Sequence, residues 1–131
     1  MNKLASVTAL TSLALLLIAS TQLAVAAEDE GAAKEKLTIK EVMTTAHKDG
    51  LLAKVLKDEA TPEEKLKLLD LYIDLAESEP PQGDEKAWKD RTAQVVLSVG
   101  KVVVGRKGAN AELKKSADCM ACHGVHKPKT E

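Results

Sequence analysis

Apolar residues recur at helical spacing in the part of the chain that follows residue 37. The first such stretch opens at Thr38, and Glu41, three positions later, completes the pattern of a capping box at a helix N-terminus. The residues that keep the helical period behind this cap are Ile39, Val42, Met43, Ala46, His47 and Gly50. Gly50 is expected to bend or end this helix, and the apolar pattern continues from Leu51 to Lys57.

A second helix is predicted to begin at Thr61. The sequence Thr61-Pro62-Glu63-Glu64 combines an N-cap residue, a first-turn proline and a capping-box glutamate. The apolar stripe of this helix consists of Leu66, Leu69, Tyr72, Ile73 and Ala76. The chain is then broken by Pro80-Pro81-Gln82-Gly83.

Two more helices are predicted beyond this break. Asp84 caps the third, whose inward positions are Trp88, Val95, Val96, Val99, Val102 and Val103. The valines at 102–104 also suit a strand, but no partner strand is predicted elsewhere, so we expect helix. A turn over 105–108 leads to the fourth helix, which is expected to run from about Asn110 to Val125 and to close at Pro128.

Four amphipathic segments with short links predict an all-α fold, an antiparallel four-helix bundle. The 131 residues suffice for one domain, which we place at 37–131. Residues 28–36 are charged and rich in Ala and Gly, and are predicted to be disordered. Aromatic residues make up 2% of the chain and Phe is absent, so the core would be thin unless a flat apolar cofactor completed it.

Residues 1–27 have the features of a secretory signal peptide. Lys3 supplies a positive start, Leu10 to Ala19 is almost entirely apolar, and Ala24-Val25-Ala26 suits signal peptidase. A retained anchor is the alternative, because Leu4 to Ala27 is almost long enough to cross a bilayer. We expect cleavage, and therefore an exported, periplasmic protein with no membrane attachment once the signal has been removed.

The chain contains two cysteines, in Cys119-Met120-Ala121-Cys122-His123. Positions i, i+3 and i+4 of a helix share one face, so both thiols and the imidazole lie within one arc. Two such thiols can bind the two vinyl groups along one edge of a haem, and the imidazole can then bind the iron as proximal ligand. The motif therefore predicts covalent haem c, held between the first and the last helix.

A redox pair or a zinc site would fit this motif less well than haem does. A thioredoxin-like redox pair belongs after a strand in an α/β pattern, which this sequence lacks. A zinc site needs two further ligands, and only His47 and His126 remain. A chance match is the third alternative.

A single haem motif near the C-terminus of an exported four-helix bundle resembles the cytochrome c prime family. In that family the first helix covers the far side of the haem and often presents a methionine there. The resemblance covers the mature chain in architecture, but only Cys119, Cys122, His123 and Met43 match by motif. After the motif, this chain has His126 and Lys127 where the family often has an aromatic residue and an arginine.

Met43 and His47 compete for the sixth position of the iron. At about 100° per residue, His47 is rotated by roughly 40° from Met43 around the helix axis. The apolar arc is centred near Met43, so we expect Met43 to point into the bundle as distal ligand. His47, nearer the flank, is the alternative ligand or a partner for a haem propionate. Met43 as a core residue and an open sixth position are the remaining possibilities.

The remaining residues of interest are expected to have structural or surface roles. His126 is expected to lie in a solvated tail, and Trp88 to be a core residue. A basic surface that could dock an acidic redox partner is formed by Lys114, Lys115, Lys127 and Lys129.

Electron transfer is the function that these features favour. The net charge of −1 is mixed along the chain, which argues against a nucleic-acid partner. There is no motif for a catalytic triad or a phosphate loop, so we do not expect an enzyme; a haem peroxidase would need a polar distal group, for which only His47 is available. A gas-binding or sensing haem protein with an open sixth position is the main alternative. Redox proteins are the expected partners, and a homodimer stays open.

Overall fold

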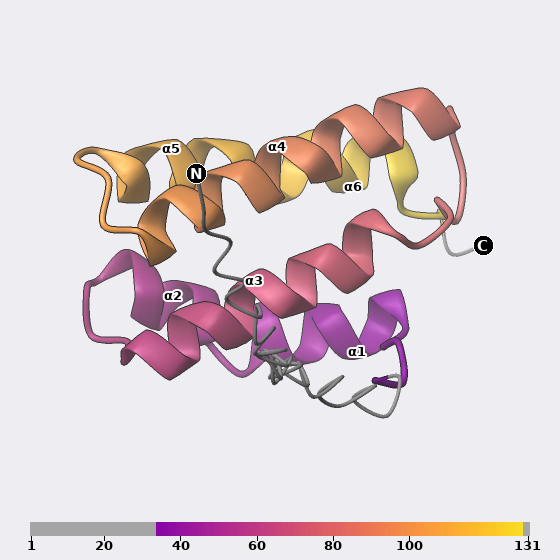
Figure 1. Cartoon of the computed structure of the whole chain (residues 1–131). Coiled ribbons are helices and arrows are strands. Elements are labelled where there is room, and N and C mark those ends of the chain that lie inside the picture. Colours follow the sequence, from indigo (N-terminus) through magenta and orange to yellow (C-terminus); the bar gives the residue numbers. More distant parts are fainter. Residues whose placement is uncertain (1–33, 130–131) are drawn as a thin grey trace, which may run out of the picture. The chain divides into compact units, whose positions relative to one another are not determined.

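The computed structural model describes residues 34–129, and all regular structure within that range is helical. This confirms the predicted all-α class. The predicted signal peptide and residues 28–33 lie outside the described residues. The elements, shown in Figure 1, are α1 (Ile39–Met43), the π-helix η1 (Thr44–Lys48), α2 (Leu51–Leu56), α3 (Pro62–Ala76), α4 (Glu85–Val103), α5 (Ala109–Ser116) and α6 (Cys119–His126).

The predicted N-caps are confirmed at three helices. Thr38 and Thr61 each take part in a complete capping box, with Glu41 and Glu64 as their respective partners. At the start of α4, the carboxylate of Asp84 accepts a hydrogen bond from the backbone N–H of residue 87 at 2.7 Å. Each cap satisfies backbone donors that the first turn of a helix leaves without partners.

A π-helical turn interrupts the first helical segment. The N–H of Asp49 donates to the carbonyl of Thr44 at 2.8 Å, a bond that spans five residues instead of four. Gly50 then adopts φ = 83°, a left-handed conformation that costs glycine little, and α2 begins behind it. The break at Gly50 is as predicted, whereas the π turn is not foreseen by the sequence pattern.

The helix predicted from Asn110 to Val125 is wrong as a continuous element. The chain leaves the helical path at Ala117 and Asp118, so α5 and α6 are separate helices. The carboxylate of Asp118 accepts a hydrogen bond from the N–H of Ala121 at 2.9 Å and thereby caps α6. A short acidic side chain can bind nearby backbone N–H groups in this way, and it then starts a new helix instead of continuing the old one.

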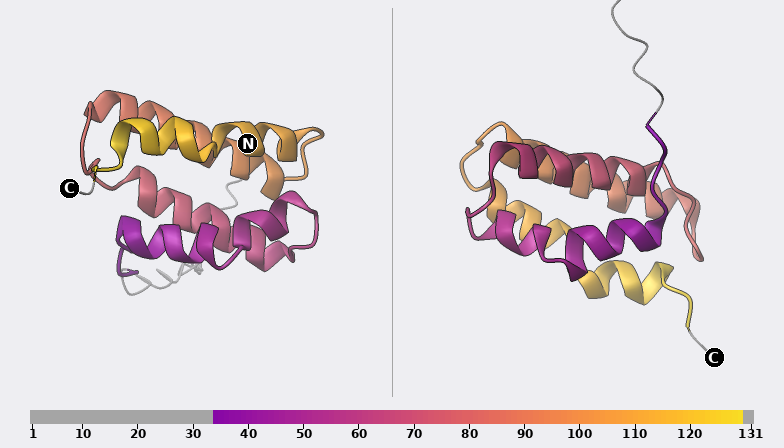
Figure 2. Two further views of the ribbon diagram at one scale, coloured as in Figure 1. Left: turned by 180° about the vertical axis from the view of Figure 1, so that it is seen from behind. Right: turned by 90° about the horizontal axis from the view of Figure 1, so that it is seen from below.

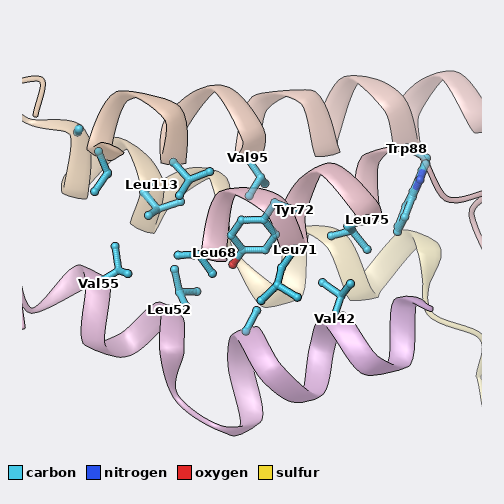
Figure 3. Packing of buried hydrophobic residues seen from close by; sticks show 14 residues of the cluster. Val42, Leu52, Val55, Leu68, Leu71, Tyr72, Leu75, Trp88, Val95 and Leu113 are labelled. Carbon is cyan, nitrogen blue, oxygen red and sulfur yellow. The ribbon is translucent and has the colours of Figure 1, made fainter. Parts of the chain in front are cut away.

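The core lies mainly between α3, α4 and α5, with α1, η1 and α2 packed against it. α3 and α4 run in opposite directions on either side of the 80–83 break (Figure 1). Figure 3 shows the apolar side chains that meet there. The largest fully buried apolar side chains are Tyr72, Leu68, Leu113, Val42, Val55 and Val99. Tyr72 and Trp88 are the chain's two aromatic residues, apart from its histidines, and both are buried.

The segment that precedes α1 is attached to α3 by ion pairs. Lys34 pairs with Asp70 and Asp74 of α3, the second at 3.0 Å. Among the helices of residues 34–129, not one combines the length and the apolar character needed to cross a membrane.

Candidate cofactor site

The cysteine motif occupies the first turns of α6. Because Asp118 caps this helix, Cys119 is its first residue and Cys122 and His123 follow one turn later. Both cysteines are free thiols, and they line the same cavity as His123. Met120, between the cysteines, is 76% exposed and lies outside the lining. The local cap thus places the two thiols and the imidazole on one side of the helix.

The cavity in front of this turn has a volume of about 390 Å³ and is lined mostly by apolar surface. Its other walls come from α1, η1, α3, α4 and the end of α5, and the residues that form them include Met43, His47, Tyr72, Leu75, Thr92 and Val95. A second cavity of about 410 Å³ also contains Met43, Cys122 and His123 in its lining. Volumes of this order are typical of cofactor sites.

The two cavities share one set of walls between α1 and α6. Met43 belongs to α1, Cys122 and His123 belong to α6, and all three line both spaces. The rear view in Figure 2 shows α1 and α6 on the same side of the domain, in front of α3 and α4. A flat apolar group held by α6 would therefore face α1, as expected for a haem between the first and the last helix.

The face that α1 and η1 turn toward the core differs from the predicted one. Val42 and Ala46 are fully buried, so they, and not Met43, mark the centre of the apolar arc. Met43 and His47 are both only partly buried, and both line the first cavity. Met43 packs against the core and lines both cavities, in keeping with the expectation that it points into the bundle, whereas His47 lines the first cavity beside it instead of staying at the flank.

His47 is held by a hydrogen bond that the sequence did not suggest. Its Nε2 lies 3.3 Å from the hydroxyl of Tyr72, and the two rings meet edge to face with centroids 6.0 Å apart. Burial lowers the pKa of His47, and the nearby His123 lowers it further. Burial also raises the pKa of Tyr72. The phenol and the imidazole are therefore both neutral, and the tautomer of His47 decides which of them donates the hydrogen bond.

Charged side chains contribute to the walls of both cavities. Burial raises the pKa of the Cys122 thiol, while the guanidinium of Arg91 acts in the opposite direction. Arg91 and Lys48 both contribute to the lining of the first cavity, and Lys40 contributes to that of the second. The lining of the first cavity also includes the carboxylate of Asp118. Mostly apolar cavities in which cations outnumber carboxylates suit an apolar ligand that carries carboxylates.

His126 is not part of a solvated tail, contrary to the prediction. It is only 4% exposed, and its ring packs edge to face on Trp88 with centroids 5.2 Å apart. Its Nδ1 lies 3.1 Å from the carbonyl oxygen of Gln82. The amide of Gln82 in turn donates to the carbonyls of Val125 and Lys127. Trp88 is buried as predicted, and together these contacts fasten the end of α6 to the loop between α3 and α4.

The loop residue Gly83 leaves room for this contact. It adopts φ = 86°, and a Cβ at this position would lie 3.1 Å from Nδ1 of His126. Proline and glycine at 80–83 predicted only a break in the chain. The structure shows that this loop also contacts the His126 ring, through the carbonyl of Gln82 and the backbone of Gly83.

We expect His126→Ala to lower the free energy of unfolding by about 2 kcal/mol, because it removes a buried ring and leaves polar groups without their partner. Urea denaturation of both proteins, purified in the same way, measures this. Val125→Ala is the matched control, since Val125 is 51% exposed and its truncation should change stability by less than about 0.5 kcal/mol. Equal stabilities of His126→Ala and the wild type would show that the ring has no anchoring role.

Within residues 34–129, no group of three or more His, Cys, Asp and Glu side chains is arranged to hold a metal ion. Haem iron differs from such a site because the porphyrin supplies most of its ligands. Comparison of the chain with protein-family models, curated proteins and solved structures gave no match.

Sequence reasoning missed two residues near the motif. Tyr72 was assigned only to a core stripe, and its hydroxyl finds a partner 25 positions away in the sequence. His126 was assigned to the tail because lysines surround it. A buried tyrosine needs a partner for its hydroxyl, which is the one feature that could have drawn attention to Tyr72.

Proposed function

We propose that the chain is an exported monohaem c-type cytochrome that acts in electron transfer. The observation that carries this proposal is that Cys119, Cys122 and His123 lie on one side of α6, in a mostly apolar cavity that Met43 faces from α1. The expected arrangement is an antiparallel four-helix bundle in which α1, η1 and α2 form the first arm and α5 and α6 the last. The haem would lie between these two arms.

The two cysteines would hold the haem covalently. Each thiol adds across one vinyl C=C bond: sulfur bonds to the carbon next to the ring, the thiol hydrogen goes to the outer carbon, and nothing is lost. Because the thiols stand one helical turn apart, they can reach two substituents on the same edge of a macrocycle. Bound in this way, a haem supplies an iron that changes its oxidation state by one electron.

His123 is the proximal ligand in this proposal, and Met43 is the distal one. Met43 lines both cavities together with His123, whereas His47 lines only the first. The nitrogen that His47 would offer to the iron is already within hydrogen-bonding distance of Tyr72. These two observations favour Met43 and keep His47 as the alternative.

Acid-acetone extraction tests the covalent attachment. Protein made with the haem-attachment machinery should keep its haem through the extraction, because thioether bonds survive it. Changing Cys119 and Cys122 together to Ala should release the haem, and Met120→Ala, between them, should not. If the haem of the wild type extracts freely, or if the purified protein contains none, the proposed function is wrong.

Gas binding or sensing is the second candidate function, and the pair of His47 and Tyr72 favours it. Both are polar side chains in the mostly apolar lining of the first cavity, where they could bind a diatomic ligand by hydrogen bonding. This function requires an open sixth position. An absorption spectrum of the reduced protein with and without carbon monoxide separates the two, because iron with two protein ligands changes little and open iron changes strongly.

The expected partners are other redox proteins on the outer side of the cytoplasmic membrane. The exposed lysines at the end of the chain, Lys114, Lys115, Lys127 and Lys129, would favour an acidic partner surface. The location follows from the predicted signal peptide at residues 1–27.

A further inference from the structure

Tyr72 brings a hydroxyl into the part of the site where a distal ligand must lie. Its side chain comes from α3, is 1% exposed, and lines the same cavity as His123 and both cysteines. Among residues 34–129, the side-chain group within hydrogen-bonding distance of this hydroxyl is Nε2 of His47, at 3.3 Å. No buried side-chain nitrogen or oxygen in the described part of the chain lacks a hydrogen-bond partner. Tyr72 and His47 therefore form a direct contact within the lining of the cavity.

The same nitrogen cannot serve Tyr72 and an iron at once. A neutral imidazole has one ring nitrogen that carries hydrogen and one with a free electron pair. When the hydroxyl of Tyr72 donates to Nε2, that electron pair is occupied and the hydrogen sits on Nδ1. His47 must break this hydrogen bond before Nε2 can bind a metal.

Met43 is not restrained in this way. It lies one helical turn before His47, and both side chains line the first cavity. The π turn η1 begins directly after Met43 and contains His47, and π turns often occur where a helix serves a functional site. Two side chains that are able to bind iron thus stand side by side, and one of them is already engaged.

We propose that Tyr72 is a positioning residue that holds His47 away from the iron, so that the sixth position is left to Met43. The proposal rests on the haem site proposed above. It assigns the choice of distal ligand to a residue of α3, a helix that itself supplies no ligand. A single hydroxyl would therefore decide between a His/Met and a bis-His centre.

The clearest test uses the Met43→Ala variant as background. There the sixth position should be open, and reduced protein should bind carbon monoxide. Adding Tyr72→Phe removes only the hydroxyl and keeps the buried ring, so His47 becomes free to bind the iron. We expect the affinity for carbon monoxide to fall by roughly two- to tenfold, which corresponds to the loss of one hydrogen bond. The ferric spectrum should change to that of a low-spin bis-imidazole centre.

Whether the affinity for carbon monoxide falls or rises on Tyr72→Phe shows whether Tyr72 positions His47 or only fills space. If Tyr72 merely filled space, its alteration would loosen the pocket and raise the access of carbon monoxide. In the triple variant with His47→Ala, the affinity should return to that of Met43→Ala. Unchanged affinity after Tyr72→Phe would overturn the proposal. So would a Met43→Ala variant that is already closed and that opens on His47→Ala, because Tyr72 would then not be holding His47.

Failure of this proposal can be told apart from failure of the haem site. Wild-type protein that loses its haem on acid-acetone extraction refutes the proposed function before any variant is made. If the protein keeps its haem, but Tyr72→Phe does not change the affinity of the Met43→Ala variant for carbon monoxide, only the positioning role is refuted. A wild type that is open at the sixth position would also refute the positioning role as proposed, because Met43 would then not occupy the position that Tyr72 is proposed to leave to it.

Discussion

Chain made without haem should be largely molten instead of forming a cooperative fold. The two cavities measure about 390 and 410 Å³ and are lined mostly by apolar side chains. At about 24 cal/mol per Å³, an empty cavity of the first size would cost on the order of 9 kcal/mol. Both cavities open to solvent, so water would fill part of the space, and we expect a loss of several kcal/mol. The whole stability of a small domain is only about 5–15 kcal/mol.

The composition of the core points in the same direction. Tyr72 and Trp88 are its only large aromatic side chains, and both lie beside the cavities that the haem would fill. A haem would add apolar contacts to α1, α3, α4 and α6 at the same time. Because this haem would be covalently attached, it would stay on the chain in the unfolded state, and it would stabilise the fold through the apolar surface that it buries only in the folded state.

Circular dichroism and urea denaturation measure this effect. Holoprotein should give a cooperative transition and a strong near-ultraviolet signal, whereas chain without haem should keep helical signal but lose both of these features. The Cys119→Ala, Cys122→Ala variant is the control, because it cannot form a disulfide that would confuse the comparison. A sharp, native-like transition in the haem-free chain would show that the core is complete without the cofactor.

Helix starts could be predicted because the chemistry that makes them is local. At Thr38, Thr61 and Asp84, a side chain satisfies a backbone N–H within the next three residues. No distant contact is needed for such a cap, so the sequence alone contains the information. The break at Gly50 is predictable for the same reason, since it depends on the conformation of a single residue.

The elements around the cavity could not be predicted, because tertiary contacts decide them. Asp118 either points to solvent from a continuous helix or caps a new one, and nothing in its neighbourhood determines which. His126 is buried only because the ring of Trp88 and the backbone of Gln82 are in place. The burial of these residues is a property of the assembled fold, and patterns in the sequence do not contain it.

The π turn is the third such case, and it bears on the distal ligand. An angular count at 100° per residue assumes a regular α-helix, but η1 departs from one between Thr44 and Lys48. Val42 and Ala46 face the core, and Met43 and His47 face the cavity together. The common orientation of Met43 and His47 follows from their spacing of four residues, whereas the full burial of Val42 and Ala46 depends on how this segment packs against the rest of the domain.

We expect Met43→Ala to open the iron to carbon monoxide and to remove the weak far-red absorption band that a thioether ligand gives to ferric haem. Met43 lines both cavities together with His123, and its sulfur can bind the iron without breaking a hydrogen bond. His47→Ala is the matched control: it should leave the band in place, because His47 is engaged with Tyr72. The variant without Met43 should also have a lower reduction potential, since a thioether favours ferrous iron.

The pair of variants discriminates between three states of the site. Loss of the band in Met43→Ala alone assigns the ligand to Met43 and supports a His/Met electron carrier. A bis-imidazole spectrum in the wild type that turns high-spin only in His47→Ala would make His47 the ligand and reduce Met43 to packing. A wild type that is already high-spin and binds carbon monoxide would contradict both assignments. In that case the pair of His47 and Tyr72 would face an open iron, and gas binding would account for the cavity better than electron transfer.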